Sequence, residues 1–371
     1  MTERFGDSTR AVRAVDSEAV PGQPVGPVPV PASAFHLSAA EGSEDHVYGR
    51  YSNPVWTRLE TALAGLEEAA SAVSFGSGMA AVTAALRVLC TPGQVLVVPA
   101  DGYHQVRRYA TECLAPLGIT VHEVAAEGLC DAARHADVVL AETPTNPALD
   151  VVDLHLLAGI CHRRGARLVV DNTAATPLGQ RPLELGADLV VASATKALAG
   201  HSDLLAGYVA GSHPELMAAI VRERMLAGPV PGAFDAWLLL RSIGSFGLRF
   251  DRQCQNALAL AVALEGHPRV RSVRYPGLPA DPSHAVALSQ MRRFGGLLSV
   301  ELSGAEAVHA LVRHSELLVA ATSFGGLHTS VDRRARWGDA VPDGFARISA
   351  GIEDTEDLVA DVLGALDAGG L

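Results

Sequence analysis

Short apolar runs alternate with amphipathic stretches from residue 53 to residue 192 of the chain. The amphipathic stretches predict helices over residues 55–67 and 79–89, because their apolar positions recur at helical spacing. The apolar runs predict strands over residues 70–75, 94–99, 137–142, 167–171 and 188–192. Such runs between helices indicate parallel strands covered on both faces, and sheets of this kind bind ligands at the carboxyl ends of their strands.

The pattern changes near Phe246, where a second and smaller α/β domain is predicted to begin. Its helices are predicted over residues 248–264, 305–313 and 357–366, and its strands over residues 270–275, 296–302 and 347–349. We therefore divide the globular part of the chain into a large domain over residues 53–245 and a C-terminal domain over residues 246–371.

Residues 1–52 are rich in proline and glycine and show no sustained period. They are predicted to form an extended arm, and a long arm on a compact enzyme usually packs against something, here a neighbouring subunit. A disordered tail is the alternative that this composition also permits.

Composition favours a cytoplasmic enzyme. The chain has 371 residues, of which 49% are hydrophobic, enough for two domain cores. A formal net charge of −12 argues against nucleic acid or an anionic membrane as the main partner. The five cysteines are scattered and odd in number, which is typical of a reduced cytosolic protein and predicts neither a disulfide framework nor a metal site. No signal-peptide pattern or membrane-spanning run is evident, so we expect a soluble protein.

Lys196 is the only lysine of the chain, which uses arginine elsewhere. It follows an apolar strand and is preceded by the small residues Ser193, Ala194 and Thr195. Arginine cannot replace lysine where a neutral amine must attack a carbonyl, so this single lysine is a candidate nucleophile. A stray surface lysine is the alternative interpretation.

Asp171 ends the predicted strand over residues 167–171. A carboxylate at the tip of a buried strand costs desolvation free energy unless it is paired. The protonated pyridine nitrogen of a flat cofactor is one such partner, with an attraction on the order of 4 kcal/mol at about 4 Å. That pairing keeps the ring able to accept electrons from a carbanion. A helix cap or a metal ligand is the alternative, although no His, Cys or Glu cluster stands nearby in the sequence.

The sequence GSGMAA at residues 76–81 lies between a predicted strand and a predicted helix. Small residues there let backbone amides approach a phosphate at the positive end of the helix. The same letters also match a dinucleotide-binding fingerprint, with Asp101 at a plausible distance for a ribose contact. Ser193 and Thr195 offer two further hydroxyls for a phosphate beside Lys196.

Four other side chains are candidates by position. Tyr103 follows the strand over residues 94–99 and could stack on a cofactor ring, or simply pack. Tyr48 and Arg50 lie at the end of the arm, where an arginine suits a phosphate. Arg347 could hold a substrate carboxylate through a bidentate contact. A surface arginine is the default reading of either arginine taken alone.

Taken together, these segments resemble the Cys/Met-metabolism PLP enzymes, which include cystathionine γ-lyases, cystathionine γ-synthases and methionine γ-lyases. The resemblance rests on motifs in family order: YGRYSNP (48–54), GSGMAA (76–81), ETPTNP (142–147), DNT (171–173), QRPLELGAD (180–188), SATKALAGHSD (193–203), SFGG (323–326) and RISAGIED (347–354). It covers nearly the whole chain and is nearest to the shorter actinobacterial cystathionine γ-lyases, with which residues 101–109 and RRARWG (333–338) also agree.

The resemblance implies the fold type I of PLP-dependent transferases, similar to aspartate aminotransferase, with a mainly parallel seven-stranded sheet in the large domain and a smaller α/β C-terminal domain. It implies that Lys196 carries pyridoxal 5′-phosphate (PLP) as a Schiff base and moves protons, that Asp171 pairs with the pyridine nitrogen, and that Tyr103 stacks on the ring. The other residues implied at the cofactor are Gly78, Met79, Asn146, Ser193 and Thr195.

The resemblance also implies a homotetramer, in which Tyr48 and Arg50 reach the phosphate of a neighbouring subunit. Asn146, Ser323 and Arg347 would bind the amino-acid substrate, with Arg347 on its α-carboxylate, and Thr322 would lie beside them.

Four features depart from the family pattern. His104 and Gln105 replace the usual small pair after the stacking tyrosine, and Thr322 stands where animal and yeast lyases have an acidic residue. Ala174 replaces a common phenylalanine, and the loop between His328 and Arg347 is short. The first two departures leave the identity of the substrate open.

The expected reaction is γ-elimination of L-cystathionine to L-cysteine, 2-oxobutyrate and ammonia, which would make the chain a carbon–sulfur lyase of trans-sulfuration. γ-Replacement on an acylated homoserine, as in a synthase or sulfhydrylase, uses the same residues, and so does a methionine γ-lyase. From other classes, an NAD(P)-binding dehydrogenase would rest on GSGMAA alone and leave Lys196 unexplained. A catalytically silent regulatory or scaffold protein would need a broken cofactor site.

Overall fold

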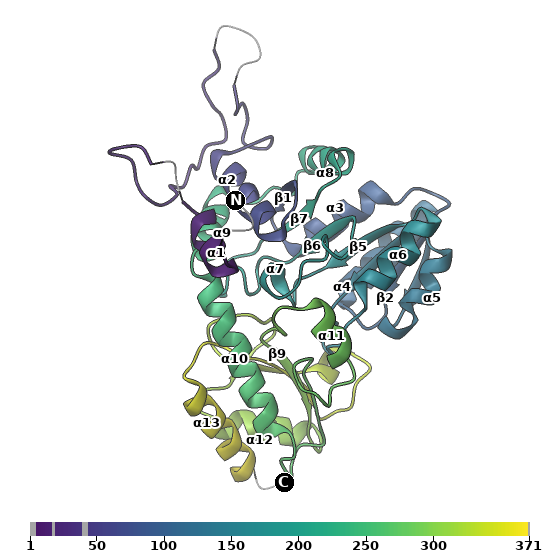
Figure 1. The fold of residues 1–371 in the computed structure, drawn as a ribbon, viewed down its shortest axis with the longest axis vertical. Helices are drawn as coiled ribbons and strands as arrows, with labels where there is room; N and C mark the ends of the chain where they lie inside the picture. The colour runs from purple at the N-terminus through teal and green to yellow at the C-terminus, as the bar shows by residue number, and fades with distance from the viewer. Residues whose placement is uncertain (1–4, 17–18, 39–43, 370–371) are drawn as a thin grey trace.

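The computed structural model describes residues 5–16, 19–38 and 44–369. Parts of the predicted arm (1–4, 17–18, 39–43) and the last two residues of the C-terminal domain (370–371) lie outside the described residues. Two α/β units are joined by the long helix α10 (Phe246–Leu264), which runs from the upper unit into the lower one in Figure 1.

The upper unit is built on a sheet of seven strands in the order β1-β7-β6-β5-β4-β2-β3. β7 is antiparallel to both of its neighbours and every other pair is parallel, so the mainly parallel seven-stranded sheet is confirmed. It follows that β1, β2, β4, β5 and β6 all end at the same edge. The strands are β1 (Ser71–Phe75), β2 (Val95–Pro99), β3 (Thr120–Val124), β4 (Val138–Glu142), β5 (Arg167–Asp171), β6 (Leu189–Ala192) and β7 (Gly207–Gly211).

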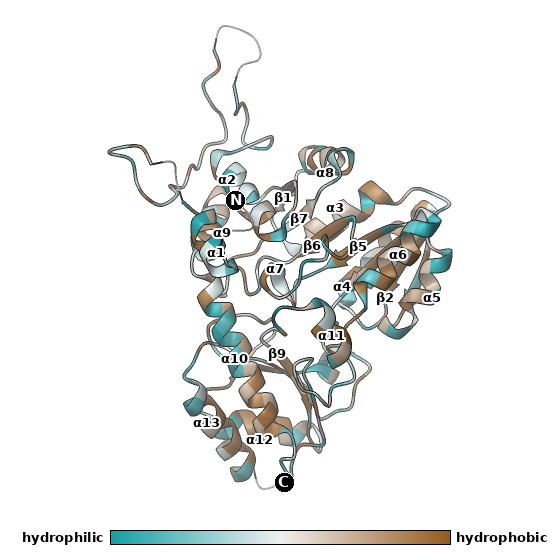
Figure 2. Ribbon diagram, in the orientation of Figure 1, coloured by the Kyte–Doolittle hydropathy of each residue, from teal (hydrophilic) through white to brown (hydrophobic). Residues whose placement is uncertain are grey.

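Helices bury both faces of this sheet because each central strand is apolar on both sides. On β5, Val169 packs into the core formed with α3 (Gly78–Leu89) and α8 (Pro214–Ala227). The neighbouring Leu168 and Val170 face the opposite core, under α6 (Leu154–Arg164). Apolar side chains therefore cover both faces of the sheet, and Figure 2 shows the strands around β5 in brown.

The remaining helices of this unit are α2 (Pro54–Glu67) and α9 (Ala233–Ile243), which pack together over β1, and the short α4 (His104–Tyr109), α5 (Leu129–Ala132) and α7 (Thr176–Gly179). α2 begins at Pro54, and the side chain of Asn53 caps it by accepting from the Val55 N–H at 2.9 Å.

The lower unit has a five-stranded sheet in the order β10-β11-β12-β9-β8. Its strands are β8 (Ser272–Arg274), β9 (Leu297–Glu301), β10 (Val319–Ala320), β11 (Ser330–Arg333) and β12 (Phe345–Ser349), and its helices are α11 (His284–Gln290), α12 (Ala305–His314) and α13 (Thr355–Ala368). Apolar residues of α10, α12 and α13 form one core with the sheet, which confirms a smaller C-terminal α/β unit.

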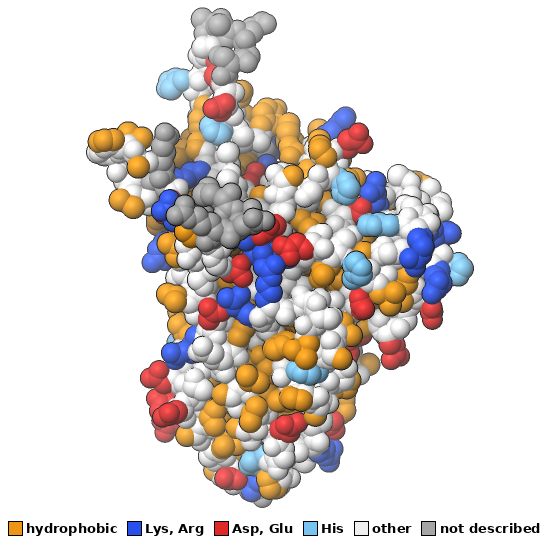
Figure 3. Space-filling view, in the orientation of Figure 1, with side chains coloured by type: hydrophobic (Ala, Val, Ile, Leu, Met, Phe, Trp, Pro, Cys, Tyr) orange, Lys and Arg blue, Asp and Glu red, His pale blue; other side chains and the backbone are white. Residues whose placement is uncertain are grey.

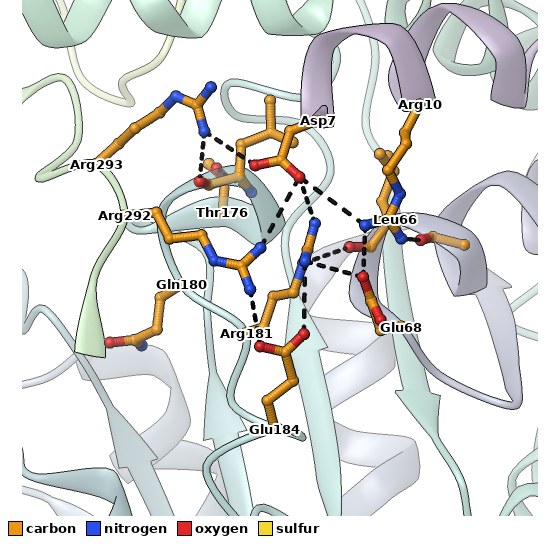
Figure 4. A network of polar contacts seen from close by, with 12 residues as sticks. Asp7, Arg10, Leu66, Glu68, Thr176, Gln180, Arg181, Glu184, Arg292 and Arg293 are labelled. Carbon is orange, nitrogen blue, oxygen red and sulfur yellow. Dashed lines mark hydrogen bonds and ion pairs between the residues drawn. The ribbon is translucent and has the colours of Figure 1, made fainter. Parts of the chain in front are cut away.

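The structure differs from the predicted arm at its beginning, where Asp7–Ala14 form the helix α1. The helix is held by its polar contacts, because Asp7 lies between Arg181 of the large domain (2.6 Å) and Arg293 of the C-terminal domain (3.2 Å), as Figure 4 shows. Arg10, one turn later, pairs with Glu68 at 2.5 Å. The rest of the described arm, residues 15–16, 19–38 and 44–52, includes loops that project from the body of the molecule in Figure 1. It is attached where the Trp237 indole N–H donates to the Pro27 carbonyl at 2.8 Å and the Asn53 amide donates to the Val30 carbonyl at 2.9 Å.

Charges of both signs are interspersed over the face drawn in Figure 3, with no extended basic area on it. This distribution agrees with the acidic net charge of the sequence. Within the described part of the chain, every helix is too short or too polar to cross a membrane.

Candidate active site

Lys196 lies just beyond the carboxyl end of β6, where small residues fix its backbone. Gly325 of the C-terminal domain packs so closely that a Cβ there would lie 3.0 Å from the Lys196 carbonyl carbon and 2.5 Å from the Ala197 nitrogen. Burial and, less strongly, the Arg347 guanidinium lower the pKa of the amine to about 8, although Asp171 acts in the opposite direction. An appreciable fraction of the amine is therefore neutral near pH 7.5 to 8, as a nucleophile requires.

Asp171 ends β5 beside Glu142, the last residue of β4, and both carboxyls are buried. Thr173 donates two hydrogen bonds to Asp171 Oδ1, from its backbone N–H at 3.0 Å and from its hydroxyl at 2.5 Å. Burial raises the pKa of both carboxyls, and for Glu142 the charge of Asp171 adds to the rise. Two neighbouring buried carboxyls create a strong preference for a cationic partner at this edge.

The turn from β1 to α3 meets the residues that precede Lys196. Ser77 caps α3 by accepting from the Ala80 N–H at 3.1 Å. A Cβ on Gly78 would lie 2.6 Å from the Ser193 Cβ, so only glycine permits this approach. The structure thus brings Gly78, Met79 and Ser193 together at a helix N-terminus, the place where backbone amides bind phosphate. Thr195 is also here, but its hydroxyl exchanges hydrogen bonds with the Ala206 backbone.

Tyr103 lies at the same edge, directly before α4. Its backbone N–H donates to Glu142 Oε2 at 2.7 Å, which ties the β2–α4 turn to the end of β4. Its side chain is 40% exposed and packs edge-on against His104, with 5.1 Å between ring centroids. His104 Nε2 lies 2.9 Å from the Gln105 amide nitrogen, so the two residues that depart from the family pattern contact each other beside Tyr103.

The C-terminal domain supplies a second group of side chains. Lys196 Nζ donates to Ser323 Oγ at 2.7 Å. Arg347, on β12, is 3% exposed and donates to Asn146 Oδ1 at 2.7 Å and to the Ser323 carbonyl at 2.6 Å. Phe324 lies between the two cations, 5.2 Å from Lys196 Nζ and 5.1 Å from the Arg347 guanidinium carbon. Thr322 is exposed on the preceding position.

Tyr48 and Arg50 lie apart from this group. Arg50 donates to the Met225 carbonyl at 2.7 Å, at the end of α8, and its guanidinium lies 5.5 Å from the Tyr48 ring. Tyr48 is 43% exposed. Among the described residues, no hydrogen bond or ion pair joins either side chain to Lys196, Asp171 or Arg347.

The geometry bears on the alternative interpretations of Asp171 and Asp101. Asp171 is not a helix cap, since α7 begins after Ala175 and has no side-chain cap. In the described ranges, no group of three or more His, Cys, Asp and Glu side chains could hold a metal ion. Asp101 Oδ2 accepts a hydrogen bond from the Ala126 N–H at 3.1 Å, which joins the turn after β2 to the segment after β3, while Oδ1 is buried without a hydrogen-bond partner among the described residues.

Comparison with known proteins decides the family. Residues 8–367 match the family described as Cys/Met metabolism PLP-dependent enzyme. The chain belongs to this family.

Its relatives carry several activities. A putative cystathionine γ-lyase of Streptomyces coelicolor is 47% identical over 98% of this chain and 94% of its own length. A cystathionine γ-synthase of Mycobacterium bovis is 38% identical over 98% of both chains. The crystal structure of a methionine γ-lyase from Micromonospora echinospora superposes with a TM-score of 0.91 at 37% identity, covering 98% of this chain and 99% of the other. The chain is therefore a PLP-dependent trans-sulfuration enzyme of the carbon–sulfur lyase type, and the dehydrogenase reading is wrong.

The site geometry fits the family cofactor. The chain's single lysine has a lowered pKa, two buried carboxyls lie at the adjacent strand ends, and Gly78 brings Ser193 close to the N-terminus of α3. These three features match the aldehyde, the ring nitrogen and the phosphate of PLP respectively.

Three residues of the site were missed by the sequence reasoning. Glu142, Thr173 and Phe324 all lie within motifs that carry the resemblance, but no role was predicted for them. Glu142 ends an apolar run just as Asp171 does, so the same argument from a carboxylate at a buried strand tip could have found it. Thr173 also accepts from the Ser193 N–H at 2.8 Å, a contact that depends on the pairing of β5 with β6 and has no sequence signal.

Proposed function

We propose that the chain is a cystathionine γ-lyase, which converts L-cystathionine and water to L-cysteine, 2-oxobutyrate and ammonia. The observation that carries this choice within the family is the 47% identity to a putative cystathionine γ-lyase over nearly the full length of both chains. The geometry around Lys196 supports the chemistry that all candidate activities share.

PLP, when bound, supplies an electron-accepting ring that stabilises the negative charge left after Cα loses its proton. We assign Lys196 to hold the cofactor and Asp171 to pair with its ring nitrogen, while Gly78, Met79, Ser193 and Thr195 hold its phosphate. Asn146 and Tyr103 complete the cofactor pocket in this assignment.

Two side chains of the protein are assigned to the proton transfers. The Lys196 amine, with its pKa of about 8, is suited to take the Cα proton and to return protons near neutral pH. The Tyr103 hydroxyl is assigned to give a proton to the departing sulfur. Arg347 is assigned to the substrate α-carboxylate, because its guanidinium is buried and already oriented by hydrogen bonds to Asn146 and Ser323. Asn146, Ser323 and Thr322 are assigned to the same substrate.

Assembly and location belong to the same proposal. Tyr48 is exposed and Arg50 donates to the end of α8, and among the described residues neither side chain bonds to Lys196, which supports their assignment to the phosphate of a neighbouring subunit in a homotetramer. A cytoplasmic location is expected for an enzyme of sulfur amino-acid metabolism.

The second candidate is γ-replacement on an acylated homoserine, favoured by the 38% identity to cystathionine γ-synthase. Turnover of L-cystathionine alone should be compared with turnover of O-acetyl- or O-succinylhomoserine in the presence of cysteine or sulfide, with methionine as a third substrate. Faster release of 2-oxobutyrate from cystathionine than formation of cystathionine (with cysteine) or homocysteine (with sulfide) from the acylated substrates supports the lyase. The opposite order assigns the chain to the synthase activity.

A further inference from the structure

Arg347 faces a buried acidic residue across the small sheet. Asp332 on β11 lies directly opposite Arg347 on β12 in the antiparallel ladder. The Asp332 carboxylate is 3.7 Å from Arg347 Nη2, and the two residues are 4% and 3% exposed. Arg347 Nη1 donates to Asn146 Oδ1 and Nη2 donates to the Ser323 carbonyl, so Asp332 adds a carboxylate beside the same Nη2 that binds Ser323.

Asp332 is itself held by the segment that follows β11. Arg334 donates to Asp332 Oδ2 at 2.8 Å, and the Trp337 indole N–H donates to Oδ1 at 2.9 Å. Arg334 also donates to Asp339 at 2.8 Å, so this arginine links the Asp332 carboxylate to the other end of the segment over residues 332–339. Each Asp332 oxygen therefore has a fixed donor, and a carboxylate restrained in this way can act as a rigid support.

The positive charges of Arg347 and Arg334 lie close together, so a carboxylate beside them is needed to keep Arg347 in place. Burial lowers the pKa of Arg347 to about 10, and the neighbouring Arg334 adds to that effect, whereas Asp332 and Asp339 oppose it. Without the Asp332 carboxylate, two buried guanidiniums would face each other with one anion fewer, and Arg347 would move from its orientation.

We propose that Asp332, fixed by Arg334 and Trp337, is the positioning residue that orients Arg347 toward the α-carboxylate of the amino-acid substrate. This inference rests on the assignment of Arg347 made under the proposed function, but not on which sulfur amino acid is the substrate. It gives the segment over residues 332–339, which stands in the short loop before Arg347, a role in substrate binding.

The test compares two ligands of the PLP-loaded enzyme that differ only in the carboxylate, L-alanine and ethylamine, by titrating the visible absorbance of bound PLP. Asp332→Asn should weaken L-alanine binding by about tenfold or more and leave ethylamine binding unchanged, since a charge-assisted contact is lost only for the carboxylate. Trp337→Phe removes one donor to Asp332 and should weaken L-alanine binding about threefold to fivefold.

Asp343→Asn is the matched control, because the Asp343 side chain is 73% exposed and pairs with Arg333 at 2.6 Å. It should change neither titration. Unchanged or tighter L-alanine binding in Asp332→Asn, or an equal loss for both ligands, overturns the inference. If Asp332→Asn does not fold, the inference is tested by the change in L-alanine binding relative to ethylamine binding in Trp337→Phe.

Arg347→Lys separates this inference from the assignment beneath it. If Arg347→Lys loses L-alanine selectivity while Asp332→Asn and Trp337→Phe keep it, only the positioning role of Asp332 fails. If Arg347→Lys itself keeps the selectivity, Arg347 does not bind the α-carboxylate, and both statements fail.

Discussion

Lys196 Nζ donates a hydrogen bond of 2.7 Å to Ser323 Oγ, so the large domain's lysine is held by a side chain of the C-terminal domain. Ser323 adopts a φ of 75°, in the left-handed region that favours glycine. A non-glycine residue in that region implies that its surroundings hold it in place, here through the Arg347 contact to its carbonyl. The site is therefore completed only where the two domains meet.

The pKa of Lys196 predicts how the enzyme without cofactor captures PLP. Only the neutral amine attacks, and burial lowers the pKa of Lys196 to about 8, so the capture rate should rise with pH and level off above about 8. An ordinary lysine would keep gaining rate toward pH ~10.4. Stopped-flow absorbance after mixing the cofactor-free enzyme with PLP measures this profile.

Because Arg347 contributes to the lowered pKa, Arg347→Gln should move the inflection of that profile to higher pH. Asp343→Asn, remote from the amine, should leave it in place. A wild-type rate that still climbs steeply well above pH ~8 would mean that the amine is not desolvated.

The fold was predictable where burial dominates and less so elsewhere. Strands buried on both faces, such as β4 and β5, can be recognised in the sequence as continuous apolar runs. β3 was not predicted, because it is an edge strand with the polar and exposed sequence Thr-Val-His-Glu-Val. β7 is fully buried but was not predicted, because glycines at both of its ends leave an apolar run too short to indicate a strand.

The site shows the same division. Lys196 and Asp171 follow from chemistry that a single residue type can supply, whereas Asp332 and Thr173 act only through partners that the folded strands bring beside them. The helix α1 escaped prediction for a similar reason, since its polar anchors lie more than 50 residues away along the chain. Local pattern indicates which residues do chemistry, and tertiary contacts determine which residues hold them.

Gly78→Ala should weaken PLP binding by about tenfold. The new Cβ would lie 2.6 Å from the Ser193 Cβ and 2.9 Å from its Cα, so the two segments assigned to the phosphate must move apart, at a cost of about 1 to 3 kcal/mol. The measurement is the dissociation constant of PLP for the reconstituted variant. Gly65→Ala, in helix α2 with open space around its Cβ, is the control and should retain PLP like the wild type. Equal retention in both variants would argue against a close phosphate cradle at Gly78.

Glu67→Gln should change how stability depends on pH. Glu67 is fully buried, and the Tyr208 hydroxyl donates to its Oε1 at 2.5 Å. Burial raises the pKa of Glu67 from 4.5 to about 7, so the folded protein keeps a proton that the unfolded chain releases. The free energy of unfolding should therefore fall by about 3 kcal/mol as pH rises from about 4.5 to 7, and level off above.

In Glu67→Gln this fall is absent, so the difference in unfolding free energy between variant and wild type should grow in favour of the variant across that window. Urea unfolding at several pH values measures it. Glu112→Gln, whose side chain is 61% exposed in an i,i+4 pair with Arg108, should follow the wild-type curve. Parallel curves for Glu67→Gln and the wild type would contradict a protonated Glu67 in the folded protein.

Asp7→Asn should loosen the contact between the two domains. The Asp7 carboxylate lies 2.6 Å from Arg181 and 3.2 Å from Arg293, and these guanidiniums lower its pKa, although partial burial acts to raise it. A carboxyl with a lowered pKa stabilises the folded state above its ordinary range of about 4, and this contribution is lost as pH falls below it. Since Arg181 keeps its ion pair with Glu68 at 3.0 Å, the loss in unfolding free energy should be moderate, about 1 to 3 kcal/mol at neutral pH.

Denaturant unfolding measures this loss. Asp16→Asn is the control, because Asp16 forms an exposed pair with Arg13 near the end of the same helix. An equal effect of the two substitutions would show that α1 is bound without its link to both domains.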